Sequence, residues 1–179
     1  MKKIISLILV ALLVVGALVA CSTNTVVDEG NNSNVDNSEI VDNEKMSLTE
    51  ILDNIYEIKS PEFALGTIEV DINDEFALTN YTGLKDAEKI EEAIASESMI
   101  GSQAYSLVLV RVKDAADAEE VAADMEDGID TRKWICVEAD DLSVDYHDEV
   151  IVLAMISSDF ADQYTSADAI NAFNSIWGN

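Results

Sequence analysis

The segment AYSLVLVRV, residues 104–112, is the strongest indication of the fold class of this chain. It is a nearly continuous run of β-branched and aliphatic residues, which is typical of an interior strand of a sheet. A second run, EVIVLAMIS at 149–157, is still more hydrophobic and predicts another central strand. The ordered part of the chain is therefore expected to form around a sheet.

Shorter segments around these two runs predict the remaining strands. TIEVDI (67–72) alternates apolar and polar residues, the pattern of a half-buried strand. KWICVEA (133–139) is expected to be a strand, and LSVDYH (142–147) either extends it or pairs with it. Adjacent strands of this kind imply hairpins and hence antiparallel pairing.

Helices are predicted between the strands and at both ends of the ordered part. Ser47 and Glu50 form a capping box ahead of apolar residues at helical spacing. Asp114 is expected to cap an alanine-rich helix over 115–127, and Thr165 with Asp168 to begin the last one. The acidic stretch 74–98 favours a short turn followed by a helix from Leu84 to Ser96.

These elements predict an α+β fold. The expected architecture is a mostly antiparallel sheet of about four strands, with helices packed mainly on one face. No internal repeat is visible in the sequence.

The first twenty residues have the pattern of a secretory signal. Lys2 and Lys3 precede an uncharged apolar run, which ends in Leu18-Val19-Ala20-Cys21. This ending resembles the lipobox of bacterial lipoproteins, a likeness that implies cleavage before Cys21 and a lipid on its sulfur. The alternative is an uncleaved N-terminal membrane anchor.

The chain is accordingly divided into three parts. Residues 1–20 are predicted to be a lipoprotein signal peptide, 21–46 a lipidated cysteine with a disordered tether rich in asparagine, serine and acids, and 47–179 a single α+β extracytoplasmic domain. The predicted location is the extracytoplasmic face of the cell membrane, held there by the lipid.

Charge narrows the range of partners. The 179-residue chain has 36 acidic and 10 basic residues and a formal net charge of −26. Nucleic acid binding is excluded because phosphates require clustered lysine and arginine. A solvated acidic surface, attraction of cations and attraction of a basic partner all remain open.

One acidic cluster is a candidate cation site. The segment 138–149, EADDLSVDYHDE, contains the only histidine of the chain. Carboxylates suit a divalent cation such as calcium or manganese. The alternative is an exposed acidic hairpin, because turns favour aspartate. The candidate ligands are Asp140, Asp141, Asp145, His147 and Asp148.

Cys136 has two readings. It could pair with His147 as a nucleophile. A small buried side chain beside Trp134 is the favoured interpretation, since a lone cysteine behaves as a compact hydrophobe. With Cys21 acylated, Cys136 would have no cysteine partner within the chain.

The segment YSLVLVRVKDAADAEEVAADMEDGID (105–130) carries a family resemblance. A strand ending in a basic residue leads through Lys-Asp into an acidic helix, and EVIVLAMIS follows about twenty residues later. This order is similar to that of a family of small bacterial lipoproteins, catalogued as domain of unknown function 4358. The likeness spans roughly 74–177 and implies location and fold without an activity.

The function expected from the sequence is binding or scaffolding by a membrane-anchored lipoprotein, with an envelope protein or a wall polymer as partner. No cofactor is expected, and no catalytic set is recognised, which favours a protein that is not an enzyme. The alternative is a divalent-cation-dependent binder or enzyme that uses residues 138–149.

Overall fold

A computed structural model describes residues 45–178 of the chain. These residues belong to the second of two units into which the chain divides, Asn43–Asn179. The predicted signal peptide, Cys21 and nearly all of the predicted tether lie outside the described residues. No helix within residues 45–178 has the length and apolar character needed to cross a membrane.

A five-stranded sheet forms the middle layer of the fold, and every neighbouring pair in it is antiparallel. Its order in space is β1-β2-β3-β5-β4, so β3 and β5 are interior strands, as predicted. The α+β class and the antiparallel sheet are confirmed, with five strands rather than about four. The strands are β1 (Leu65–Glu69), β2 (Ile90–Ser98), β3 (Tyr105–Val112), β4 (Asp141–His147) and β5 (Val150–Ile156).

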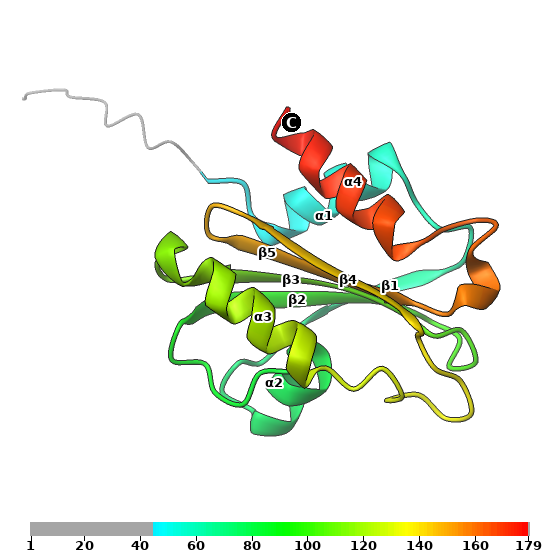
Figure 1. Cartoon of the computed structure of the whole chain (residues 1–179), viewed down its shortest axis with the longest axis horizontal. Coiled ribbons are helices and arrows are strands. Elements are labelled where there is room, and N and C mark those ends of the chain that lie inside the picture. Colours follow the sequence, from blue (N-terminus) through cyan, green and yellow to red (C-terminus); the bar gives the residue numbers. More distant parts are fainter. Residues whose placement is uncertain (1–44, 179) are drawn as a thin grey trace, which may run out of the picture. The chain divides into compact units, whose positions relative to one another are not determined.

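Helices cover both faces of this sheet (Figure 1). One face packs against α1 and α4, and the other packs against α2 and α3. The expectation of helices mainly on one face is therefore wrong. Both faces of β3 and β5 carry apolar side chains, and each face needs its own cover. The helices are α1 (Leu48–Ile58), α2 (Glu75–Thr82), α3 (Ala118–Gly128) and α4 (Ser166–Ile176), with single 3₁₀ turns at η1 (Ala115–Asp117) and η2 (Ser158–Phe160).

Predicted capping residues begin the first and last helices. Ser47 and Glu50 form a reciprocal capping box at α1. Thr165 and Asp168 do the same at α4. Each box satisfies backbone N–H groups that have no partner within the helix, which fixes where the helix starts.

Two predicted elements are wrong. Where a helix was expected over 84–96, the chain turns at Gly83, which has a φ of 79°, and then forms β2. Pairing with β1 and β3 on its two sides overrides the helical tendency of the acidic sequence. The expected strand over 133–139 is instead an irregular segment between α3 and β4.

The strand register defines two ends of the domain. At the N-terminal end, Arg111 pairs with Val150, which pairs with His147, and Lys45 contacts Glu149 beside them. At the distal end, Tyr105 pairs with Ile156, which pairs with Asp141. The eight residues of β3 separate the two ends by about 25 Å.

Candidate functional site

An open groove of about 630 Å³ lies at the distal end. Its volume is in the range of small-molecule and side-chain binding sites. One wall comes from the irregular segment 129–140, including Trp134, Cys136 and Val137. The opposite wall comes from Ser157–Asp159, at the end of β5 and the start of η2. The groove thus depends on a segment that has no regular backbone pairing of its own.

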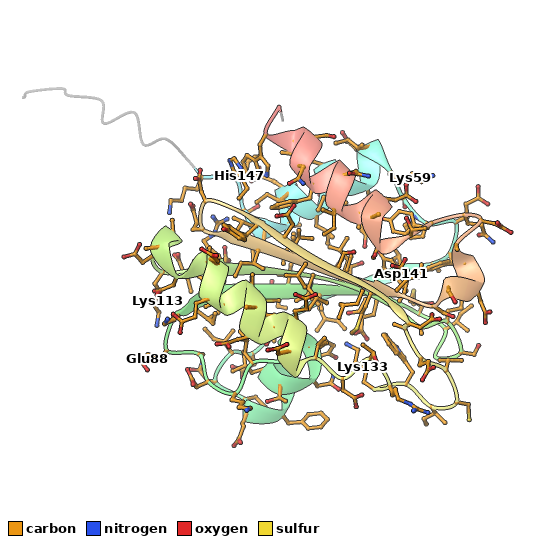
Figure 2. The ribbon with its side chains drawn as sticks, in the orientation of Figure 1. Lys59, Glu88, Lys113, Lys133, Asp141 and His147 are labelled. Atoms are coloured by element: carbon orange, nitrogen blue, oxygen red, sulfur yellow. The ribbon has the colours of Figure 1, made fainter. Side chains whose placement is uncertain are left out.

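Lys133 anchors that segment to the sheet (Figure 2). Its side chain is only 6% exposed, and its Nζ lies 2.5 Å from the carboxylate of Glu97 on β2. The same Nζ donates a hydrogen bond to the backbone carbonyl of Asn80 at 3.2 Å and lies 3.4 Å from the hydroxyl of Ser106. These contacts connect the segment to β2, to β3 and to α2.

Aromatic rings complete the surroundings of the ammonium group. Nζ of Lys133 lies 5.0 Å from the ring centre of Tyr81 and 5.2 Å from that of Trp134, within cation–π range. Burial lowers the pKa of Lys133, and the charge and hydrogen bond of Glu97 oppose that shift without cancelling it. The lysine therefore fixes the orientation of Trp134, the aromatic wall of the groove.

Carboxylates dominate the rim of the groove. Asp140 accepts hydrogen bonds from the backbone N–H and the hydroxyl of Ser158, both at 2.7 Å, and these bonds lower its pKa. Arg132 pairs with Glu138 at 3.1 Å, which neutralises one acid. Within residues 45–178, neither Asp140 nor Asp159 takes part in an ion pair, so the rim keeps a net negative charge.

Exposed apolar side chains lie on two segments at the same end of the sheet. Ile135, on the groove segment, is 85% exposed. Met99 and Ile100, in the turn between β2 and β3, are 72% and 51% exposed. Figure 1 shows this turn, the 129–140 segment and η2 at one end of the sheet. Highly exposed aliphatic side chains near a groove are available for contact with a partner.

The candidate cation ligands lie along β4 rather than around one point. Asp141 accepts hydrogen bonds from the backbone N–H of Ser166 at 2.8 Å and from its hydroxyl at 2.6 Å. Asp145 accepts one from the side-chain amide of Asn174 at 2.9 Å. Both carboxylates thus fasten β4 to α4.

The other members of the predicted cluster are separated from these. His147 stacks on Trp177 with ring centres 4.5 Å apart, at the N-terminal end. Asp148 is exposed in the adjoining turn, whereas Asp140 belongs to the groove rim. Figure 2 shows Asp141 and His147 at opposite ends of their strand. Among the described residues, no group of three or more histidine, cysteine, aspartate or glutamate side chains is arranged to hold a metal ion.

Cys136 is exposed and lines the groove, so the expectation of a buried thiol is wrong. The reason is that residues 133–139 form no strand, and Cys136 has a φ of 69° in a turn-like backbone. His147 lies at the other end of β4, about 20 Å of strand away. The structure therefore separates the cysteine from the only histidine of the chain.

A second polar cluster holds the N-terminal end together. The guanidinium of Arg111 donates to Glu92 at 2.9 Å, to Glu149 at 3.1 Å and to the backbone carbonyl of Met46 at 2.6 Å. Lys45 adds an ion pair with Glu149 at 3.0 Å. The chain preceding α1 is thereby tied to β2, β3 and the β4–β5 turn.

Sequence reasoning missed both buried cations. Arg111 is a basic residue near the end of a run of apolar residues, and that position is a usable signal for a buried, paired charge. Lys133 gave no comparable signal, because it follows Arg132 in a polar stretch. Its burial depends on contacts with Glu97, Asn80 and Ser106, which are far away in sequence.

The fold and the groove together define a class: an α+β domain with helices on both faces of an antiparallel sheet and an open, acidic, partly apolar groove at one end. Comparison of the chain with protein-family models, with curated proteins and with solved structures found no match.

Proposed function

We propose that this protein is a lipoprotein anchored through Cys21 on the extracytoplasmic face of the cell membrane, and that its α+β domain binds a partner of the cell envelope without catalysing a reaction. The apolar run before Cys21 and the resemblance to small bacterial lipoproteins support the location. Acyl chains on one sulfur and on the new amino terminus would give the stable anchoring that a single chain does not.

One observation supports the binding role: the chain enters the domain at one end of the sheet, and the groove lies at the other end. The chain enters at Lys45, where Arg111 and Glu149 fix it. The groove and the exposed Ile135 lie at the other end of the sheet. A partner in the groove would therefore leave the contacts of Lys45, Arg111 and Glu149 in place.

Cell fractionation tests the anchor. The wild-type chain is expected in the membrane fraction, and Cys21→Ala is expected to leave it, because the sulfur is the proposed site of lipid attachment. A wild-type chain found in the cytoplasmic fraction would contradict the location. A Cys21→Ala chain that stayed with the membrane would favour an uncleaved N-terminal anchor.

Photo-crosslinking in intact cells tests the binding role. A photoreactive phenylalanine analogue at Ile135 is expected to give a reproducible crosslinked protein or wall fragment. The matched control places the same analogue at Phe76 on α2, which is 79% exposed and lies outside the groove. Equal products from the two positions would show that the distal end has no special role in binding.

A further inference from the structure

The chemistry of the groove indicates what kind of partner it accepts. Trp134 and Val137 supply an apolar wall, and Lys133 contacts the ring of Trp134 while it pairs with Glu97 on the sheet. The segment is also closed on itself, since the backbone N–H of Ala139 donates to the carbonyl of Thr131 at 2.9 Å. The wall is therefore formed before any ligand arrives, and binding does not have to order it.

The negative charge of the groove rim favours a ligand that carries a positive charge. Arg132, a cation on the rim, is engaged by Glu138. The carboxylate of Asp140 is oriented by Ser158, and Asp159 follows on the same wall. The strongly acidic chain around them adds a negative field, which attracts cations and repels anions. A cationic group on the ligand is thus complementary to the rim.

The exposed aliphatic side chains at this end of the sheet favour a polypeptide as the ligand. Ile135 projects from the groove segment, and Met99 and Ile100 are exposed at the same end of the sheet. Covering an isoleucine side chain of this exposure removes apolar surface from water, which favours association. A polysaccharide offers few aliphatic side chains for that purpose, whereas a polypeptide offers them beside its basic residues.

We infer that the distal groove binds a basic, aliphatic segment of a partner polypeptide; this inference rests on the proposed function and specifies its partner. The cationic end of a lysine or arginine lies between Asp140 and Asp159. Its methylene stem packs on Trp134, in the manner of long basic side chains on apolar surfaces. A neighbouring aliphatic side chain covers Ile135.

The two tryptophans of the chain make the inference testable within one sample. Trp134 lines the groove, whereas Trp177 stacks on His147 at the N-terminal end. The probe is the peptide acetyl-KLKLK-amide, added to the full lipoprotein in nonionic detergent, with the two indole N–H signals followed by ¹⁵N NMR. The Trp134 signal is expected to shift with saturation and the Trp177 signal to stay in place.

Controls separate specific binding from general attraction. The peptide acetyl-ELELE-amide is expected to leave both signals unchanged. Asp159→Asn is expected to weaken binding about threefold, and Ile135→Ser about tenfold. Phe76→Ser removes a similarly exposed hydrophobic side chain outside the groove, 79% exposed against 85% for Ile135, and is expected to leave the affinity unchanged.

Several results would overturn the inference. The inference would be wrong if the indole N–H signal of Trp134 did not shift, if the signals of both tryptophans shifted equally, or if the acidic peptide bound as well as the basic one. If the basic peptide fails while the photoreactive group at position 135 still captures a partner in cells, the partner chemistry is wrong and the proposed binding role stands. If both fail, the binding role falls as well.

Discussion

Two basic side chains are buried at opposite ends of this domain, and they are held differently. Arg111 donates to two carboxylates and a backbone carbonyl that come from three separate parts of the chain. Among residues 45–178, Lys133 has one carboxylate partner, Glu97, together with weaker polar and aromatic contacts. The planar guanidinium suits several fixed acceptors at once, whereas the ammonium group is a compact charge that loses more by desolvation.

The two buried cations therefore have different structural roles. At the N-terminal end, the contacts of Arg111 fix where the chain enters the fold. At the distal end, Lys133 holds a segment without regular structure, and that segment displays Trp134 and Ile135. We therefore expect the N-terminal end to contribute more to global stability, and the distal end to open locally first.

The largest expected effect comes from Arg111→Ala. It leaves the partly buried carboxylate of Glu149 with Lys45 alone and removes the donor to Met46. Breaking a buried ion pair from one side is strongly destabilising, so the free energy of unfolding should fall by about 3 kcal/mol. Urea unfolding followed by circular dichroism measures this loss.

Lys113→Ala is the matched control for Arg111. Lys113 lies two residues further along the chain, and its exposed ammonium group donates to the carbonyl of Glu88 at 2.7 Å. A change within about 0.5 kcal/mol is expected, as for most surface substitutions. If the two variants lost equal stability, burial and the three partners of Arg111 would not be what stabilises this end.

Lys133→Met should have the next largest effect. Methionine keeps the unbranched stem and removes the charge, which leaves Glu97 with Ser106 as its hydrogen-bond donor. The expected loss is about 2 kcal/mol, less than for Arg111 because fewer charged partners are stranded. Hydrogen exchange should accelerate in residues 129–140 before it does in β3, since the lysine anchors that segment.

A second substitution tests whether the ion pair is the cause. Adding Glu97→Gln to Lys133→Met removes the stranded charge, so at least half of the lost stability should return. If the double variant were no more stable than Lys133→Met, the loss would come from packing against Tyr81 and Trp134 instead.

The parts of the fold that the sequence predicted are those set by local pattern. The apolar runs that form β3 and β5 and the capping boxes of α1 and α4 are each visible within a dozen residues. Their physical causes, burial on both faces and satisfaction of backbone N–H groups, act between near neighbours. Prediction was accurate in these elements.

The secondary-structure predictions were wrong in segments whose conformation depends on contacts with residues far away in the sequence. Residues 90–98 resemble a helix in composition, and only pairing with strands on both sides makes them β2. The segment 133–139 alternates like a strand, yet Lys133 fixes it over the sheet face rather than in the sheet. The groove could not be predicted because its walls come from two segments that the fold brings together.

The two ends should also respond to opposite extremes of pH. Partial burial would raise the pKa of Glu149, but Lys45 and Arg111 outweigh it and leave the pKa below its usual 4.5. The unfolded chain therefore binds this proton more readily, and the stability from Glu149 is lost as pH falls below about 4.5. Unfolding of wild type and Glu149→Gln across pH 3–7 should show their difference shrinking in acid.

Lys133 gives a pH dependence of the same sign, but at alkaline pH. Burial leaves its pKa below the ordinary value of 10.5, so the unfolded chain holds the proton to higher pH than the folded chain does. Stability from this residue therefore rises as pH increases through its folded pKa toward 10.5. Wild type should gain stability relative to Lys133→Met as the pH rises toward 10.5. A relative loss over that range would show that the Glu97 ion pair outweighs burial.

The smallest effect concerns one residue at each end with a left-handed backbone. Cys136 has a φ of 69° and Asp148 a φ of 48°. A side chain with a Cβ is strained there by about 1 kcal/mol, although aspartate tolerates the region better than most residues. Glycine removes the strain but makes the unfolded chain more flexible, which offsets part of the gain.

Cys136→Gly should therefore raise the free energy of unfolding by up to about 0.5 kcal/mol, and Asp148→Gly by less. Cys136→Ala is the control, because it removes the thiol and keeps the Cβ, and it should give no gain. If alanine stabilised the chain as much as glycine, the thiol and not the backbone would be the unfavourable feature of this position. Because Cys136 lines the groove, that result would also show that the wall beside Trp134 is shaped by side-chain contacts rather than by a constrained turn.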